Sequence, residues 1–477
     1  MKSTFVAAGV AVAACAAYLG VAVLGGQKVE KKLRAMSVTA QAEWPMVRVT
    51  DERYDRHLFD ATHTFTLRTG CDAPDAGASA PQATITIVQH IKHGPFPGFA
   101  GFFGAATVDT ELAMDASTRQ QVAKFFGTDR PFQAHTDVAF SGATHTHFSV
   151  VRFHVSAPQS QNVDFQGLTG DVDNSDSALE YDVRMPSVSI ADAASAPAAL
   201  HMTLNGTHIH TRAEGTGDLA LRPSKSQGEV QSLEFAMAAP DTGTAHKVGL
   251  TQLKFSQDTS VDKTLMSSVG RAEGVGQIDD TKLDRIEFQS TMKRFDAATY
   301  LGLVRRLMLN DQQTCGKMPD PAKLMASQDV QAAVLQMLSA NPEISLDKLV
   351  VEVAGKRAEL RYAIGVEGFA AADAKMPLMA GLMARGYGNL RVNLPEDWVQ
   401  KSMTYVAQQS GQASGAVDQA ALAEVMLAKV IDQGYVVREA GMLSSEVAFK
   451  SGRATINGKP LGGPAAGSAV TATATSM

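Results

Sequence analysis

Residues 83–98 read ATITIVQHIKHGPFPG, and this stretch decides the fold class. Its first part, Ala83–His93, is rich in β-branched residues and predicts a strand. The Gly-Pro-Phe-Pro-Gly that follows must end the strand, because proline cannot donate to a ladder hydrogen bond and glycine permits the turn. Upstream, Thr62–Arg68 alternates apolar and polar residues with the period of a half-buried strand.

The same alternation continues through the middle of the chain, where Thr, Val, Phe and His alternate with polar residues. Gly, Asn, Asp and Pro mark the turns, which is typical of an antiparallel meander with one buried face. The predicted strands are Thr144–His154, Ala178–Ile190, Ala199–Ala213, Gly217–Leu221, Val230–Ala236, Lys247–Ser256 and Lys282–Thr291.

From Asp296 the pattern changes to helices mixed with strands, and Asp296 can cap the first helix. The predicted helices are Ala297–Met308, Pro321–Leu338, Ala370–Arg385, Glu396–Gln408 and one after Asp418, whose apolar stripe is Leu422, Val425, Met426 and Val430. The predicted strands are Leu346–Val353 and Ala358–Ile364, a hairpin around Gly355-Lys356, then Tyr435–Arg438 and Ser445–Lys450. We therefore predict an α+β fold that is mainly β, with an N-terminal transmembrane helix and a large antiparallel body.

These patterns divide the chain into five parts. The predicted parts are a membrane anchor over residues 1–26, a charged stem over 27–45, an antiparallel β-rich domain over 46–295, an α+β C-terminal region over 296–461 and a disordered tail over 462–477. The tail is predicted to be disordered because it consists of Gly, Ala, Ser and Thr with little to bury.

The segment Phe5–Leu24 carries no charge over 20 residues. As a helix it would span roughly 30 Å, the thickness of a bilayer's hydrocarbon core. Its length favours an uncleaved signal anchor over a cleaved signal peptide. Two alternatives remain: cleavage near Gly20-Val21-Ala22, or lipidation of Cys15 after Val12-Ala13-Ala14.

The orientation of this anchor is contested by the charges around it. Lys28, Lys31, Lys32 and Arg34 follow the apolar segment and only Lys2 precedes it, so the positive-inside rule would keep the C-terminal bulk in the cytoplasm. Against this, the stretch 27–36 around Glu30 predicts a short amphipathic helical stem. We expect the bulk to be exported to the periplasm.

The chain has three cysteines, Cys15, Cys71 and Cys315. Cys71 and Cys315 could form one disulfide in an oxidising compartment, or be two unrelated free thiols. The composition is that of a globular protein, with 45% hydrophobic and 19% charged residues. The net charge of −6 argues against a nucleic-acid partner, which requires a basic surface.

Two histidine pairs, His145-x-His147 and His208-x-His210, place imidazoles on one face of a strand. On neighbouring strands such pairs could bind zinc, and the alternative is a solvated polar face. His90 and His93 do not share a face, and we expect His93 to organise the Gly-Pro turn that follows it. Motifs of serine hydrolases and phosphate-binding loops are absent from the sequence, so we predict no catalytic residue, cofactor or metal site.

Phenylalanines cluster among glycines in the stretch 96–126. The part that reads GFAGFFGAA could form a flap over a sheet, dip into a membrane interface, or pack as ordinary core beneath a loop. The clustered residues are Phe96, Phe99, Phe102, Phe103, Phe125 and Phe126.

Short motifs along nearly the whole chain resemble the YdgA-type family of bacterial inner-membrane and periplasmic envelope proteins of unknown function. They are the stem GQKVEKKL from Gly26, Tyr54-x-Arg56-x-x-Phe59, His93-Gly94-Pro95-Phe96, Phe165-x-Gly167-Leu168-x-Gly170, Gln433-Gly434-Tyr435, Phe449-Lys450-x-Gly452 and Asn457-Gly458-Lys459-Pro460. One departure is His57, where the family tends to have glycine. The resemblance implies an inner-membrane protein that faces the periplasm and can self-associate, and it brings no catalytic residues.

Three hypotheses for function follow. The first is a non-enzymatic envelope protein anchored in the inner membrane through residues 5–24, acting as a scaffold or binding an apolar molecule such as a lipid. The second is a homo-oligomeric structural or interaction protein of the envelope. The third is a metal-dependent hydrolase.

Overall fold

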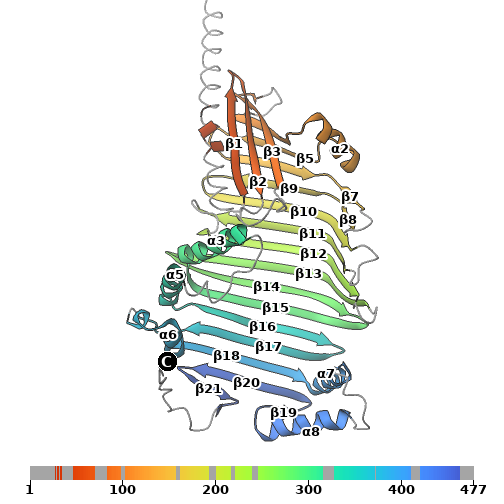
Figure 1. The fold of residues 1–477 in the computed structure, drawn as a ribbon, viewed down its shortest axis with the longest axis vertical. Helices are drawn as coiled ribbons and strands as arrows, with labels where there is room; N and C mark the ends of the chain where they lie inside the picture. Colours follow the sequence, from red (N-terminus) through yellow and green to blue (C-terminus); the bar gives the residue numbers. More distant parts are fainter. Residues whose placement is uncertain are drawn as a thin grey trace, which may run out of the picture. The chain divides into compact units, whose positions relative to one another are not determined.

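The computed structural model describes residues 27, 30, 31, 33, 34, 47–69, 83–97, 103–156, 162–192, 200–215, 221–238, 245–314, 327–370, 372–409 and 419–461. The protein is mainly β, with a large antiparallel sheet and few helices (Figure 1). The chain divides into two compact units. Unit 1 comprises residues 1–266, 274–280 and 297–333, and unit 2 comprises 267–273, 281–296 and 334–477.

Several predictions fall outside the described residues. They concern the segment Phe5–Leu24, the three cysteines, most of the strand Gly217–Leu221 and the tail 462–477. Within the described part of the chain, no helix is long and apolar enough to cross a bilayer. Residues 27, 30, 31, 33 and 34 of the predicted stem are helical.

Unit 1 is built from antiparallel strands that mostly follow one another in the sheet as they do in the chain. These strands are β1 (Val47–Arg56), β2 (Asp60–Thr69), β3 (Ala83–His93), β4 (Ala106–Leu112), β5 (Phe132–Val138), β6 (Thr144–Val150), β7 (Phe153–Val155), β8 (Asn162–Phe165), β9 (Leu168–Asn174), β10 (Ala178–Ala191), β11 (Leu200–Glu214), β12 (Ser224–Ala238) and β13 (Ala245–Asp262). The hydrogen-bonded order is β1-β2-β3-β4-β5-β6-β9-β10-β11-β12-β13. β8 pairs with the last residues of β10, and β7 pairs with β8.

The strand predictions are largely confirmed in unit 1. β3 begins and ends at the predicted residues, and β10 and β11 differ from the prediction by one residue at an end. The predicted strand Thr144–His154 is instead two strands, β6 and β7, which pair with different partners. The sequence analysis predicts neither β14 (Leu265–Ile278) nor the helix α2 (Ala116–Phe126).

Cross-strand register separates a charged face from an apolar face in unit 1. One row of directly opposed residues runs across β3, β4, β5, β6, β9, β10 and β11, and all its members are acidic or histidine: His90, Asp109, His135, His147, Asp171, Asp182 and His210. The neighbouring row, on the other face, includes Ala61, Ile91, Val108, Val172 and Tyr181. Because side chains alternate along a strand, the two rows face opposite sides.

Four strands of unit 1 are irregular at the same row. The row contains Pro186, Gly206, Gln231 and Gln252 of β10 to β13, and φ is positive at Gly206 (59°) and Gln252 (54°). In β10 the large apolar residues before Pro186 have odd numbers, as Val183 does. The large apolar residues after Pro186 have even numbers, as Val188 does. Regular pleating would put those two sets on opposite faces, so the irregular backbone keeps one face apolar along the strand.

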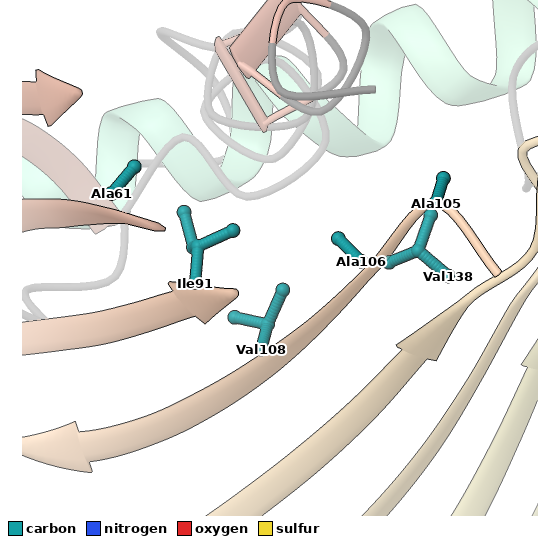
Figure 2. Close-up of a cluster of buried hydrophobic side chains, with 6 residues drawn as sticks. All are labelled: Ala61, Ile91, Ala105, Ala106, Val108 and Val138. Carbon is teal, nitrogen blue, oxygen red and sulfur yellow. The ribbon is translucent and has the colours of Figure 1, made fainter. Parts of the chain in front are cut away.

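The core of unit 1 lies on the apolar face of β2 to β5. Figure 2 shows its six buried residues, which are Ala61, Ile91, Ala105, Ala106, Val108 and Val138. Leu33 of the stem and Tyr54 of β1 pack against them. Burial, followed by the charge of Glu30, raises the pKa of Tyr54 to about 12.

Unit 2 contains a second run of antiparallel pairings. Its strands are β15 (Thr281–Asp296), β16 (Glu343–Val353), β17 (Lys356–Val366), β18 (Gly386–Pro395), β19 (Val437–Glu439), β20 (Met442–Lys450), β21 (Arg453–Ile456) and β22 (Lys459–Pro460). They pair in the order β15-β16-β17-β18-β20, with β19 and β21 on the far side of β20 and β22 beside β21. The predicted hairpin around Gly355 is confirmed as β16 and β17.

The remaining helices are close to those predicted, except that the predicted helix Ala370–Arg385 is instead a short 3-10 helix and a separate α-helix that begins after Pro377. They are α3 (Ala297–Thr314), α5 (Gln328–Ser339), the short 3-10 helix η3 (Asp373–Lys375), α6 (Leu378–Arg385), α7 (Glu396–Gln409) and α8 (Gln419–Asp432). The predicted apolar stripe of α8 is wrong in part. Val425 and Met426 are 65% and 54% exposed, whereas Leu427 is buried. Helical spacing identified an apolar side of α8 but not the side that packs.

Replacing Ile91 by alanine should destabilise unit 1, because Ile91 is 1% exposed at the centre of the core. A buried Ile→Ala change costs about 2–5 kcal/mol in the free energy of unfolding. Ile85→Ala on the same strand is the matched control, since Ile85 is 44% exposed. Pulse proteolysis of the two full-length variants across a urea series measures both changes. Equal losses would contradict this location of the core.

Candidate functional site

The charged face of unit 1 carries a ladder of histidine–carboxylate pairs. His135 Nδ1 lies 2.6 Å from Asp109 Oδ1, and His147 Nδ1 lies 2.8 Å from Asp171 Oδ1. His145 Nδ1 lies 2.8 Å from Asp173 Oδ1. Each carboxylate sits on the strand adjacent to its histidine, so cross-strand register creates every pair.

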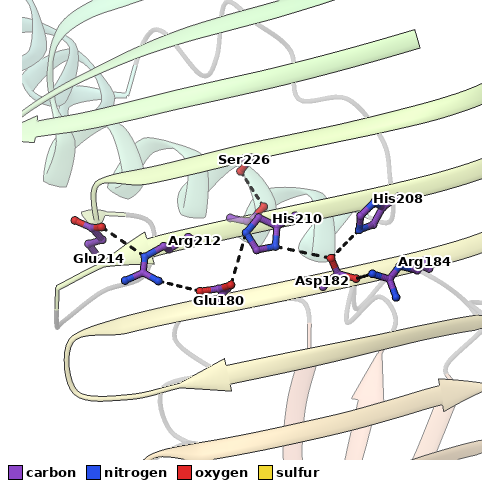
Figure 3. A network of polar contacts seen from close by, with 9 residues as sticks. Glu180, Asp182, Arg184, His208, His210, Arg212, Glu214 and Ser226 are labelled. Atoms are coloured by element: carbon purple, nitrogen blue, oxygen red, sulfur yellow. Dashed lines mark hydrogen bonds and ion pairs between the residues drawn. The ribbon is translucent and has the colours of Figure 1, made fainter. Parts of the chain in front are cut away.

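The ladder continues over β10 and β11, where arginines join it (Figure 3). His208 Nε2 lies 2.7 Å from Asp182 Oδ2, and Arg184 lies 3.1 Å from the same carboxylate. Arg212 Nη1 donates to Glu180 Oε2 at 3.0 Å. Histidines and arginines are therefore interspersed with carboxylates along this face, and the pairs are mostly half exposed, so each pair adds little to stability.

The two predicted histidine pairs do not lie on neighbouring strands. β9 and β10 separate β6, which carries His145 and His147, from β11, which carries His208 and His210. Within the described part of the chain, no group of three or more His, Cys, Asp or Glu residues is placed to hold a metal ion. No acidic residue is close to either histidine pair in the sequence, because the carboxylates that contact these histidines lie on neighbouring strands.

His93 lies on the other face and is 2% exposed. Its Nε2 is 3.2 Å from the carbonyl oxygen of Asp60 in β2. The predicted separation from His90 is confirmed, and this contact joins the His93 ring to the neighbouring strand, whereas its role in the Gly-Pro turn stays a prediction. The register brings it there because β2 and β3 pair along their whole length.

Unit 2 contains an apolar pocket of about 520 Å³. Its floor is one row across β16, β17, β18 and β20, made by Ile344, Ile364, Gly388 and Phe449. Met337 and Leu338 of α5 and Leu382 and Met383 of α6 form its walls. The volume lies within the range of about 300–1,000 Å³ that is usual for small-molecule sites.

Glycine and methionine give this pocket room and adaptability. A Cβ built on Gly388 would meet only the carbonyl oxygen of Ala363, at 3.8 Å, so the floor has space at its centre. Met337 and Met383 line the pocket, and Met383 is 49% exposed. Methionine side chains are flexible and polarizable, and they suit surfaces that adapt to irregular apolar ligands.

A single polar cluster borders the pocket at Tyr387. The Tyr387 hydroxyl donates to Glu343 Oε2 at 2.5 Å, and Lys293 Nζ donates to Glu343 Oε1 at 2.8 Å. The hydrogen bond from Lys293, then that from Tyr387, lowers the pKa of Glu343. Burial, then the bond to Glu343, raises the pKa of Tyr387 to about 12. Tyr387 thus stays neutral, and the pocket walls carry no charge at neutral pH.

Unit 1 also has a wider, open hollow of about 1210 Å³ beside the irregular row. Its lining includes Arg184, His208 and Glu229 together with the rings of Phe153 and Phe165, which are tilted at 37° with their centroids 5.1 Å apart. The hollow mixes cations, anions and aromatic rings, so its lining indicates no single class of ligand.

The apolar pocket was not predicted from the sequence, because the residues that line it are spread from Phe295 to Phe449 along the chain. The available signals were the methionines of α6 and the close glycines Gly386 and Gly388. Neither signal locates a pocket until the strands are paired.

The histidine at the centre of the ladder should titrate above its ordinary pKa of about 6.5. The hydrogen bond to Asp109 raises the pKa of His135, with the charges of Asp109 and Asp137 adding to it. The pair therefore stabilises the fold below the unfolded-state pKa, and this contribution is lost as the pH rises through the raised folded-state pKa. In an NMR titration, Asp109→Asn should lower the midpoint of His135. An unchanged midpoint would show that the pair does not form.

The comparisons with known proteins add a family and nothing finer. No curated protein and no solved structure matches the chain. One family model does match, over residues 1–462, and its description is "Bacterial protein of unknown function (DUF945)". Because that match covers far more than half of the 477 residues, the chain belongs to the bacterial family DUF945.

Proposed function

We propose that this chain is a non-enzymatic envelope protein, anchored in the inner membrane by residues 5–24, that binds an acyl chain of a lipid in the pocket of unit 2. The observation that carries this proposal is the pocket itself, whose floor and walls are apolar apart from the hydroxyl of Tyr387. The periplasmic location rests on the sequence of the anchor and on the YdgA-type resemblance.

The chemistry of the pocket favours a hydrocarbon over a polar ligand. Entry of a polar group would leave its hydrogen bonds unmet, because the one hydroxyl present already donates to Glu343. Each buried methylene contributes about 0.8 kcal/mol, so a few methylenes suffice for measurable binding. A protein anchored in a bilayer also has acyl chains in constant supply.

The rim of the pocket favours no particular head-group charge. Lys293 is paired with Glu343, and Lys450 lies 2.9 Å from Glu367. Cations and anions are thus matched around the entrance. We infer that selectivity resides in the hydrocarbon and not in the head group.

Filling the pocket should abolish lipid binding and leave the fold intact. Gly388→Leu places a side chain over the floor at a position where a Cβ meets no close atom. Displacing two methylenes of ligand, at about 0.8 kcal/mol each, should weaken binding at least about tenfold. Cells fed a photoactivatable fatty acid and expressing the full chain report this, by mass-spectrometric mapping of cross-linked peptides.

The matched control for this experiment is Gly249→Leu in β13, where an added Cβ also meets no atom within 4 Å. Cross-links should map to α6 and β17 in the wild type and in Gly249→Leu, and should disappear in Gly388→Leu. Cross-links that are absent from these segments, or equally strong in Gly388→Leu, would refute acyl binding in this pocket.

A reporter that is active only outside the cytoplasm, fused after Met477, should be active in cells. This outcome is expected because Phe5–Leu24 is long enough to anchor an exported chain. If a cytoplasmic reporter is active instead, Lys28, Lys31, Lys32 and Arg34 set the orientation by the positive-inside rule. The envelope location would then be wrong, although the pocket could still bind an acyl chain.

A further inference from the structure

Three turns at the same end of the strands of unit 1 expose large apolar side chains. The turns join β1 to β2, β3 to β4 and β5 to β6. The exposed residues are Leu58 (50%), Phe59 (42%), Phe96 (48%), Phe103 (64%) and Phe140 (38%). We name these five residues the aromatic edge. Aromatic side chains gathered at this exposure in a monomer indicate a contact surface.

The aromatic edge is held together by backbone and ring contacts. The N–H of His93 donates to the carbonyl of Phe59 at 2.9 Å, which ties the first turn to the end of β3. The N–H of Ala105 donates to the carbonyl of Val138 at 2.8 Å, which ties the second connection to β5. The ring centroid of Phe103 lies 5.3 Å from that of Phe96 and 5.2 Å from that of Phe140.

The core directly behind this edge also receives the stem. Ala105, Ala106 and Val138 are buried next to the turns (Figure 2). Leu33 packs against this core. Glu30 lies 3.7 Å from Arg56, the last residue of β1. The stem therefore contacts unit 1 at the same end as the aromatic edge.

The length of chain between anchor and stem limits how far this end can lie from the bilayer. The apolar segment ends at Leu24 and Glu30 follows six residues later. Six residues span at most about 20 Å even when extended. A bilayer that holds Phe5–Leu24 must then lie within about 20 Å of Glu30, and unit 1 meets it with the end that carries the aromatic edge.

Cationic side chains also lie at the end of unit 1 that carries the aromatic edge. Lys31 and Lys92 lie at this end and are exposed, and Arg34 and Arg56, also exposed, both pair with Glu30, at 3.3 and 3.7 Å. Cations near a membrane surface attract anionic head groups, at about 1 kcal/mol per residue. A surface that combines exposed phenylalanines with flanking cations matches the boundary between head groups and acyl chains.

We propose that the aromatic edge inserts into the head-group and acyl boundary of the bilayer that holds the anchor, as a second membrane contact of the same chain. The inference rests on the anchor in the proposed function and is independent of the pocket. It fixes the orientation of unit 1 relative to the bilayer, because two separate membrane contacts restrict rotation of a domain more than one does.

The test places a fluorescent side chain at the edge of the full-length protein. The chain has two tryptophans, Trp44 and Trp398, and both are replaced by phenylalanine. Phe103→Trp is then added, the protein is reconstituted in liposomes, and bromine-labelled acyl chains are used as quenchers. Insertion should shift the emission to the blue and remove about half of it. Phe235→Trp in β12, also at an exposed phenylalanine (38%), is the control and should remain unquenched.

Flotation of the same liposomes reports on the anchor separately. Flotation with quenching at Phe103→Trp and none at Phe235→Trp supports the proposal. Flotation without quenching at Phe103→Trp overturns the proposal, although the protein would still be anchored. If the emission is blue-shifted but unquenched in that case, the occupant of the aromatic edge is a second protein copy. Failure to float overturns the anchor and this inference together.

Discussion

The alternation of side chains along antiparallel strands is the constraint on which every feature of this protein depends. Paired backbone groups hold neighbouring strands in register, and the register sends successive residues to opposite faces. In unit 1 it lines up His90, Asp109, His135 and the rest of the ladder on one side. In unit 2 the same rule assembles a pocket floor from Ile344, Ile364, Gly388 and Phe449. A shift of one residue in a pairing would destroy the arrangement that the pairing belongs to.

The elements with the clearest period could be predicted from the sequence. Ala83–His93 has strong β propensity and a proline stop, so β3 was predicted at both ends. β14 was not predicted, because its sequence LMSSVGRAEGVGQI has few bulky apolar residues and three glycines. Its burial comes from neighbouring residues, and its own sequence does not indicate it. The helix α2 was not predicted for a similar reason, because its sequence ASTRQQVAKFF has only a short apolar face. Tertiary packing decides such segments, and local pattern does not.

The candidate sites could be predicted only in fragments. Histidine spacing identified one face of β6 and β11, but the carboxylate partners of His147 and His208 are on other strands and are invisible to spacing. The phenylalanine cluster at 96–126 was recognised in the sequence, and Phe103 is 64% exposed, whereas Phe99 and Phe102 lie outside the described residues. The pocket of unit 2 had no linear signature, because Ile344 and Phe449 become neighbours only through two intervening strands.

The irregular row at Pro186, Gly206, Gln231 and Gln252 restricts how this protein can change length. Each of the four strands switches its apolar residues from odd to even positions, or the reverse, at that row. A deletion of one residue there in a single strand would remove that strand's member of the row, so its pairing with the neighbouring strands would slip by one residue on one side of the row. Length changes are therefore tolerable only when all four strands change together, whereas the loops between them are free of this coupling. Insertions and deletions within the family should accumulate in the loops and avoid this row.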